Sequence, residues 1–205
     1  MSLSHILNEL KNHFGDKPIT VCELGILHGK GIPLLLDNFN IQNYYGIDLF
    51  TPYEENKKDG ANNIMANNGD TIYNKLLNKY KKDNRIHIIK EFTNKAVDNF
   101  EDKFFDFIFV DAGHEYEQVS EDINLWYPKM KKNGIFSGDD FYFPPVQKAV
   151  YEFQDNTNLL LYNSLSVNNF AHPDNDTNDE NNKFLLKYIP SKHLYKRNFT
   201  WYFKT

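Results

Sequence analysis

Short apolar runs that alternate with segments of helical periodicity constrain the fold of this chain more than any other feature. Seven runs are rich in β-branched and aromatic residues, at 19–24, 44–49, 86–90, 105–111, 134–137, 159–167 and 198–204. Between the first five, apolar residues recur at steps of three and four, which predicts helices at 30–39, 62–81, 93–100 and 116–130. Strands that alternate with helices form a parallel sheet with right-handed crossovers.

The last two predicted strands are not separated by a clear helical pattern. Their connection contains AHPDNDTNDENNK, residues 171–183, a polar stretch that predicts a mobile loop, either a lid or an acceptor-side loop. The final pair is therefore predicted to form an antiparallel hairpin at the sheet edge. An amphipathic helix is predicted at the N-terminus, with Ile6, Leu7, Leu10 and Phe14 on one face. We expect residues 1–205 to form a single α/β domain with a seven-stranded, mostly parallel sheet.

The charge balance argues against several classes of partner. A net charge of −5 and a pI near 5.8 do not suit a protein that coats nucleic acid, because tracking phosphates needs a concentrated basic face. No run reaches the ~18 apolar residues of a membrane helix, and the N-terminus does not resemble a signal peptide. The single cysteine, Cys22, lies in an apolar run and is interpreted as a buried structural thiol. We expect a soluble, cytoplasmic protein without a nucleic-acid or membrane partner.

A glycine-rich turn follows the first predicted strand. The stretch ELGILHGKG, residues 23–31, places Gly25, Gly29 and Gly31 where a strand gives way to a helix. Glycine lets the backbone approach a ligand closely, although tight turns also use glycine for steric reasons alone. Glu23 would put a negative charge against a pyrophosphate, so the turn suits a neutral or cationic ligand better than a dinucleotide. Asp48 ends the second strand about twenty residues later, the usual position of an acid that binds ribose hydroxyls.

The stretches ELGILHGKG, GIDLF, FFDFIFVDAGHEYEQVSEDINLWYPKMKKNGIFSGDDF and WYFK together resemble class I S-adenosylmethionine-dependent methyltransferases, in the branch of macrocin O-methyltransferases and cephalosporin-hydroxylase-like proteins. The resemblance covers most of 19–153 and implies the Rossmann-like sandwich of that family. It also implies that Glu23, Gly25 and Ile26 line the methionine end of the cofactor S-adenosylmethionine and that Asp48 holds its ribose. The same resemblance places Phe92 and Thr93 beside the adenine. Many relatives carry Gly-Asp-Ser at 91–93, where this chain has Glu-Phe-Thr.

Carboxylates gather where the fourth and fifth strands end. Asp111 follows the fourth strand, and Asp139 and Asp140 follow the fifth. In the strand order of the family these strands are neighbours, ~4.8 Å apart, so the three side chains should lie within a few ångströms of one another. Such a set of carboxylates either shares protons or holds a cation. The expected cation is Mg²⁺, and Mn²⁺ and Ca²⁺ are the alternatives. Acids at strand ends also cap helices or pair with lysines. We expect the metal site, with Asp111 bordering the cofactor as well.

His114 lies three residues beyond Asp111 on the same exit turn. It is the candidate general base and, with Asp111, a candidate catalytic residue. Two other interpretations stay open: a third or fourth metal ligand, or a residue at a helix start that faces solvent.

The predicted site is compatible with three functions. The first is a metal-dependent O-methyltransferase that acts on a vicinal diol of a sugar or glycoconjugate, or on a catechol-like small molecule, because two adjacent oxygens can share one cation. The second is a hydroxylase of the cephalosporin-hydroxylase type, although redox iron usually takes two histidines and one carboxylate. The third, a noncatalytic binding module, is disfavoured by the intact cofactor turn and acid cluster. A homo-oligomer stays open, because the aromatic residues, 16% of the chain, suit an interface or a core.

Overall fold

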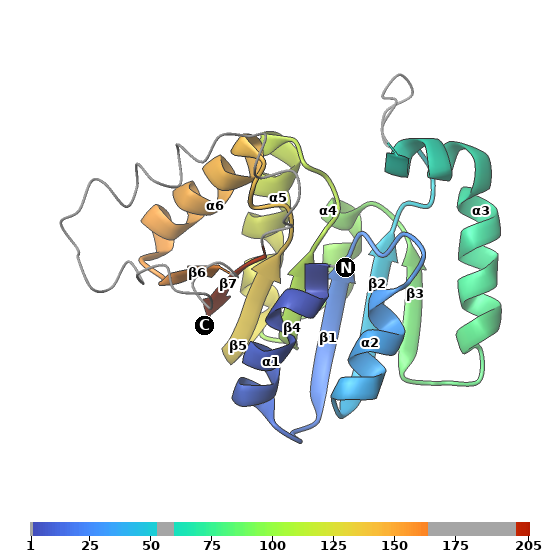
Figure 1. The fold of residues 1–205 in the computed structure, drawn as a ribbon, viewed down its shortest axis with the longest axis horizontal. Coiled ribbons are helices and arrows are strands. Elements are labelled where there is room, and N and C mark those ends of the chain that lie inside the picture. The colour runs from blue at the N-terminus through green and yellow to red at the C-terminus, as the bar shows by residue number, and fades with distance from the viewer. Residues whose placement is uncertain (1, 53–59, 164–199) are drawn as a thin grey trace.

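A seven-stranded sheet forms the middle layer of the part of the chain that the computed structural model describes, residues 2–52, 60–163 and 200–205 (Figure 1). The strands follow one another across the sheet in the order β3-β2-β1-β4-β5-β7-β6. The first five in this order pair in parallel, and β7 runs antiparallel to both β5 and β6. The strands are β1 (Ile19–Leu24), β2 (Ile41–Asp48), β3 (Ile86–Lys90), β4 (Phe105–Val110), β5 (Met130–Gly138), β6 (Leu161–Asn163) and β7 (Trp201–Lys204).

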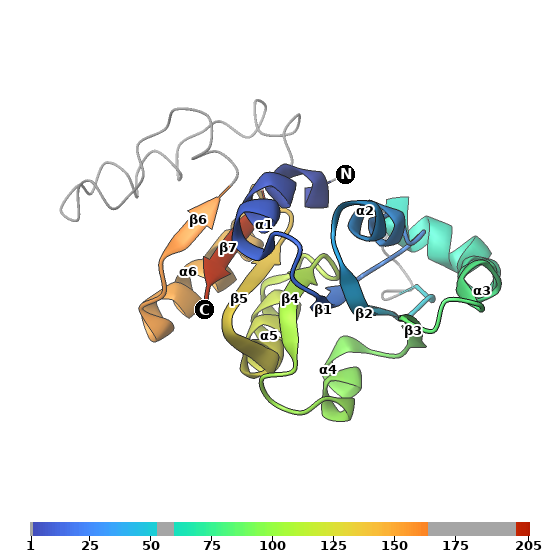
Figure 2. The ribbon, with the colours of Figure 1, turned by 90° about the horizontal axis from the view of Figure 1, so that it is seen from below.

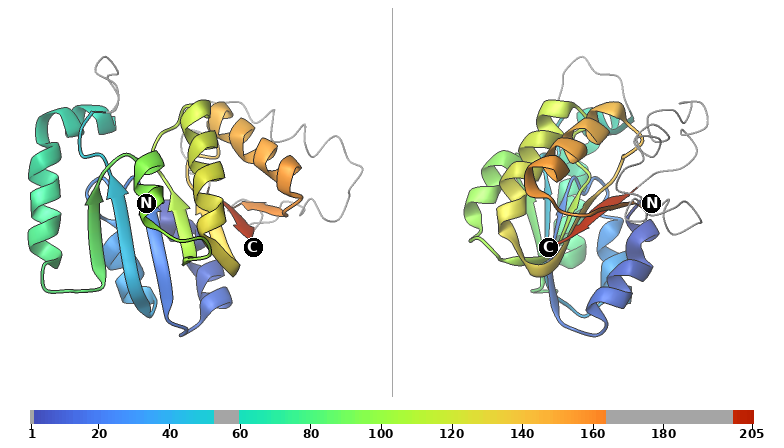
Figure 3. Two further views of the ribbon diagram at one scale, coloured as in Figure 1. Left: turned by 180° about the vertical axis from the view of Figure 1, so that it is seen from behind. Right: turned by 90° about the vertical axis from the view of Figure 1, so that its left-hand side faces the viewer.

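Helices cover both faces of the sheet (Figures 2 and 3). One face carries the 3-10 helix η1 (Ser2–Ile6) and the helices α1 (Leu7–Phe14), α2 (Gly31–Asn38) and α3 (Gly60–Tyr80). The other face carries α4 (Thr93–Ala96), η2 (Val97–Asn99), α5 (Tyr116–Trp126), η3 (Tyr127–Lys129) and α6 (Pro144–Thr157). Within the described ranges, no helix is both long enough and apolar enough to cross a membrane.

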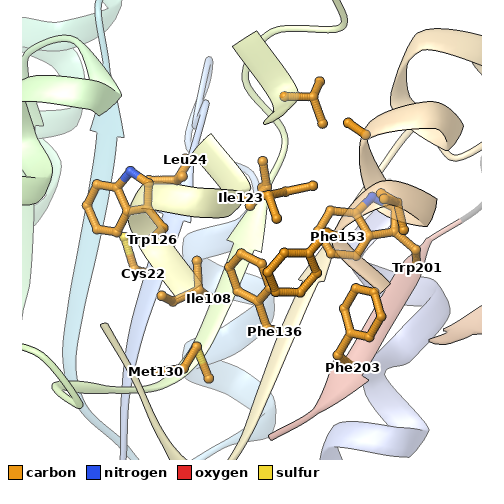
Figure 4. Close-up of a cluster of buried hydrophobic side chains, with 14 of the residues drawn as sticks. Cys22, Leu24, Ile108, Ile123, Trp126, Met130, Phe136, Phe153, Trp201 and Phe203 are labelled. Carbon is orange, nitrogen blue, oxygen red and sulfur yellow. The ribbon is translucent and has the colours of Figure 1, made fainter. Parts of the chain in front are cut away.

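Alternating side chains of the central strands supply two cores, one on each face. In β4, Phe107 and Phe109 pack under α1 to α3, whereas Ile108 and Val110 pack under α4 to α6. Figure 4 shows part of this second core, around Trp126. Because both faces of β4 are covered, its sequence is a nearly continuous apolar run instead of an alternating one.

The predicted fold class is confirmed, including the antiparallel pairing of β6 and β7 at one side of the sheet. The main difference in strand bounds is that β5 begins at Met130 and not at 134. The first residues of β5 are polar, and contacts with neighbouring segments stabilise them. Lys131 Nζ lies 2.8 Å from Asp106 Oδ2 at this end of the sheet. The predicted helix 116–130 ends as α5 at Trp126 and continues as the 3-10 helix η3. The predicted strand residues 164–167 and 198–199 and the predicted loop 171–183 lie outside the described residues.

Helix α6 is not among the predicted elements. It starts at Pro144, a residue that suits the first helical turn because it has no N–H to satisfy, and its C-cap is Asn158 in the left-handed conformation, with φ 55°. In a sequence, two consecutive prolines favour a loop. The sequence pattern therefore did not identify this helix. Its buried residues recur at steps of three and four: Val146, Ala149, Val150 and Phe153.

Candidate active site

The chain leaves β1, β4 and β5 at the same edge of the sheet. The backbone N–H of Gly25 donates to a carbonyl of β2 at 2.8 Å, that of Asp111 to Leu24 at 2.8 Å, and that of Asp139 to Val110 at 3.0 Å. These bonds extend the pairing of the sheet by one residue beyond each strand. The residues predicted to bind the cofactor and the metal therefore start from adjacent, fixed backbone positions.

The glycine turn lies directly against the exit of β4. Gly25 has φ +83°, and a Cβ atom at this position would lie 2.0 Å from the carbonyl oxygen of Asp111. A residue with a side chain would not fit here, so glycine is required where the turn packs against the backbone at the exit of β4. The side chain of Ile26 is 3% exposed and packs in the core beside Gly46. The predicted contact of Ile26 with the cofactor would therefore come from its backbone.

Glu23 supports this turn from inside the protein. Its side chain is 5% exposed, and Oε2 accepts a hydrogen bond from the hydroxyl of Tyr44 at 2.6 Å. The carboxylate occupies the space beside Gly31, where a Cβ atom would lie 2.2 Å from Oε2. Burial raises the pKa of Glu23 to about 7, although the bond from Tyr44 acts in the opposite direction. Its contact with the methionine end of the cofactor stays a prediction.

Asp48 fixes the same turn from the end of β2. Oδ2 accepts the N–H of Leu27 and Oδ1 that of Phe50, both at 2.8 Å. The two donor residues have left-handed backbones, with φ 46° and 50°, which are uncommon for residues other than glycine. Burial raises the pKa of Asp48, and these backbone bonds oppose the rise. Each carboxylate oxygen has a second lone pair, so the group can also accept the hydroxyls of a ribose.

The turn at Phe92 and Thr93 lies beside Asp48. The N–H of Glu91 donates to the carbonyl of Asp48 at 3.2 Å, which joins this turn to the end of β2. The Phe92 side chain is 49% exposed. The Thr93 side chain instead lies close to the buried carboxylate of Asp122 on α5. Of the two residues predicted to lie beside the adenine, Phe92 thus has the accessible ring and Thr93 the engaged side chain.

Three candidate metal ligands come together at the ends of β4 and β5. One ligand atom each from Asp111, His114 and Asp140 lies within 4.8 Å of the other two, and Nε2 of His114 lies 2.6 Å from Oδ2 of Asp140. Asp139, the other carboxylate predicted for this site, is 6% exposed and lines the same cavity. The structure therefore adds His114 to the cluster, consistent with one of the alternatives left open for it.

Electrostatic repulsion within the cluster favours a neutralising partner. Burial, and next the negative charges of Asp139 and Asp140, raise the pKa of Asp111 well above its ordinary value. A proton or a cation in this place would relieve that repulsion. Asp140 also has a left-handed backbone, with φ 57°, and such strained residues concentrate at functional sites.

Two aromatic rings lie beside the cluster on the His114 side. The ring of Phe143 stacks on that of His114, with the ring centroids 5.4 Å apart. The ring centroid of Tyr142 lies 4.2 Å from that of Phe143. The cavity between the acids has a volume of about 10 Å³, close to the space of one water molecule or ion. Besides Asp111, His114, Asp139 and Asp140, its lining includes Val110, Gly113, Val119, Val146 and Trp201.

Two residues near the site were missed in the sequence. The indole N–H of Trp201 donates to the carbonyl of Asp139 at 3.2 Å, a contact across 62 residues that no local pattern indicates. Asp122 could have been found, because it lies three residues after Val119 and directly before Ile123, on the inward side of the amphipathic helix. An acid in that position predicts a buried polar contact.

Comparison with known sequences gives one family and one relative. Residues 22–141 match the family model described as "Methyltransferase domain". An uncharacterized protein of Acanthamoeba polyphaga mimivirus is 27% identical over 202 residues, which cover 90% of this chain and 86% of that protein.

Solved structures share the fold. A Clostridium thermocellum protein assigned as an rRNA methylase superposes with a TM-score of 0.59 at 12% identity, covering 99% of this chain and 94% of that one. A SAM-dependent methyltransferase from Archaeoglobus fulgidus gives 0.54 at 15% identity, covering 98% and 92%. A Staphylococcus aureus protein assigned as a caffeoyl-CoA O-methyltransferase gives 0.56 at 14% identity, covering 99% and 81%. At these identities the likeness shows the fold alone.

Proposed function

Because the chain belongs to the methyltransferase domain family, whose members transfer a methyl group from S-adenosylmethionine, we propose that it is an O-methyltransferase that uses a divalent cation to methylate one hydroxyl of a vicinal diol in a sugar or glycoconjugate. The observation that carries this proposal is the cluster of Asp111, His114 and Asp140, which lies at the same edge of the sheet as Gly25 and Asp48. Both halves of the reaction would thus meet at one edge.

The residues of the chain fit the cofactor. Bound S-adenosylmethionine supplies an electrophilic methyl group on its sulfonium. Gly25 lets the turn after β1 pack against the exit of β4, Asp48 offers the ribose hydroxyls a carboxylate that two amides hold in place, and Phe92 offers the adenine an exposed ring. These contacts would fix the direction of the methyl group relative to the cluster.

The donor set fits a hard divalent cation. Asp111 and Asp140 would hold it through carboxylate oxygens, with His114 or Asp139 completing the set, and Mg²⁺ is the cation we propose, with Mn²⁺ or Ca²⁺ as alternatives. A cation bound there would lower the pKa of an acceptor hydroxyl and fix its orientation. The set contains a single imidazole, whereas the usual non-heme iron site has two, which disfavours the hydroxylase alternative.

His114 has two roles that exclude one another. Nε2 of His114 faces Asp140 within the cluster. One nitrogen cannot bind a cation and, at the same time, take the proton of the acceptor hydroxyl. As a base, His114 would take the proton as the methyl group transfers. As a ligand, it would leave that proton to solvent or to a carboxylate.

A catechol-like acceptor is the second candidate. The rings of Tyr142, Phe143 and His114 lie beside the cluster, and either a phenol ring or a pyranose could pack against them. The acidic cluster favours neutral acceptors over anionic ones in both cases. Both acceptors present two adjacent oxygens.

A panel of acceptors with labelled cofactor tests this proposal. Pyranose diols and catechols would each be paired with the analogue that lacks one of the two hydroxyls, and mass spectrometry would record the transferred methyl group. We expect transfer to diols and little to their single-hydroxyl partners. Equal transfer to both members of each pair would contradict a mechanism in which adjacent oxygens share one cation.

A further inference from the structure

Trp201 lies against the candidate cation cluster, although it comes from the last strand, β7. Its side chain is 1% exposed and lines the cavity between the acids. Strand β7 pairs antiparallel with β5, and this register places Trp201 opposite Gly138, the residue directly before Asp139. The proposed chemistry gives the side chain of Trp201 no role, so its place beside the acids requires an explanation.

Strand β5 fixes the position of this indole. The ring packs over Gly138, where a Cβ atom would lie 2.4 Å from the Cζ2 atom of Trp201, so glycine is required for the ring to lie there. The rings of Trp201 and Phe136 also pack together, with their centroids 5.7 Å apart (Figure 4). The hydroxyl of Ser137 donates to the carbonyl of Trp201 at 2.6 Å. The indole therefore has a well-defined position at the end of β5.

The N–H of the indole holds the peptide that joins Asp139 to Asp140. It donates to the carbonyl oxygen of Asp139 at 3.2 Å, in a buried place. This carbonyl and the nitrogen of Asp140 belong to one planar peptide unit. Asp140 has a left-handed backbone, which a residue other than glycine keeps where its surroundings hold it. A rotation of this peptide would change the direction in which both carboxylates point.

We propose that Trp201 is a positioning residue for the divalent cation, because its indole N–H fixes the peptide that presents Asp139 and Asp140 to the cluster. The proposal rests on the cation half of the proposed function and not on the cofactor or the acceptor. Trp201 acts through the two acids, which lose less conformational freedom on cation binding if their backbone is already fixed. Its ring also closes one wall of the cavity, whose volume of about 10 Å³ suits one ion.

Calorimetry of Mg²⁺ binding tests this role independently of turnover. Trp201→Phe keeps a ring over Gly138 but removes the N–H, so it should weaken Mg²⁺ binding about fivefold. Trp126→Phe is the matched control. Trp126 is the other tryptophan of the chain, is 0% exposed in the same core and does not line the cavity. The control loses the same atoms, and its Mg²⁺ affinity should stay within about twofold of wild type.

A double-mutant cycle locates the effect of Trp201 at the acids. In a protein that carries Asp140→Asn, Trp201→Phe should weaken Mg²⁺ binding less than about twofold, because the carboxylate that the indole helps to direct is then absent. A fivefold loss in both backgrounds would show that Trp201 does not act through Asp140 and would overturn the proposal. Equal losses for Trp201→Phe and Trp126→Phe would also overturn it, because they would assign the effect to the core as a whole.

Fluorescence tests the proposal if Trp201→Phe does not fold. In Trp126→Phe, Trp201 is the only tryptophan, and its emission should change as Mg²⁺ binds, with the midpoint that calorimetry gives. Emission that stays constant while calorimetry detects binding would place the cation away from Trp201 and overturn the proposal. A wild-type protein that binds neither Mg²⁺, Mn²⁺ nor Ca²⁺ would overturn the cation assignment and this proposal with it, so the two failures are distinguishable.

Discussion

Replacing Glu23 with glutamine should change how the stability of the protein depends on pH. The pKa of Glu23 rises from 4.5 to about 7, mainly because the side chain is buried. The folded state therefore binds this proton more tightly than the unfolded state does. The resulting contribution to stability is complete below a pH of about 4.5 and is lost as the pH rises through about 7. Since one pKa unit corresponds to about 1.36 kcal/mol, wild type should lose about 3 kcal/mol through Glu23 over this range.

Urea unfolding of wild type and Glu23→Gln between about pH 5 and pH 8 measures this effect. The difference in unfolding free energy between the two proteins should move in favour of the variant by about 2.5 kcal/mol as the pH rises from about 5 to 8. Any cost of the new amide beside Gly31 is independent of pH and leaves this change intact. Parallel curves would refute the reasoning, because they would show that the protein binds no extra proton at Glu23.

Two further variants make the test specific. Tyr44→Phe removes the hydrogen bond that favours the charged form of Glu23, so the loss of stability should move to higher pH. Glu117→Gln removes an exposed carboxylate from α5 and controls for the change of one charge.

Four other substitutions test the site. Gly25→Ala should prevent cofactor binding in calorimetry and lower the unfolding free energy by about 2 kcal/mol or more, because its Cβ would lie 2.0 Å from the Asp111 carbonyl; retained binding would contradict this. Asp48→Ala should weaken binding at least about tenfold and Asp48→Asn less, and unchanged affinity would exclude Asp48 from the site. Asp140→Asn should raise the Mg²⁺ concentration needed for turnover without changing cofactor affinity, and an unchanged Mg²⁺ requirement would remove Asp140 from the ligand set. His114→Ala should lower turnover. Added Mg²⁺ should restore the turnover of this variant if His114 is a ligand, but not if it is the base. If the variant turned over at the wild-type rate without added Mg²⁺, both roles would be excluded.

The fold could be predicted where the packing of an element depends on its own residues. Strand β4 is covered on both faces, and its apolar run therefore identifies it without any knowledge of its neighbours. The start of β5 is stabilised by an ion pair between Lys131 and Asp106 of another strand, so its polar residues do not indicate a strand. Helix α6 carries the correct periodicity, but the loop preference of Pro144 and its neighbour obscured it.

Within the site, backbone position could be predicted and side-chain direction could not. Asp48 and Asp111 were identifiable because parallel strands end at a common edge. The bond between Glu23 and Tyr44 joins residues 21 positions apart, and the bond between Trp201 and Asp139 joins residues 62 positions apart. Such contacts depend on which way each side chain turns after the sheet has formed. For the same reason, the sequence could not show that His114 would join Asp111 and Asp140.

Methyl transfer with and without a divalent cation tests the central claim most directly. The wild-type protein would be treated with excess chelator, and transfer from labelled S-adenosylmethionine to a diol acceptor would be measured before and after Mg²⁺ is restored. We expect transfer to stop in chelator and to recover with Mg²⁺, while binding of S-adenosylhomocysteine stays unchanged throughout. Transfer at the full rate in chelator would contradict the claim and would leave His114 as the group that takes the acceptor proton.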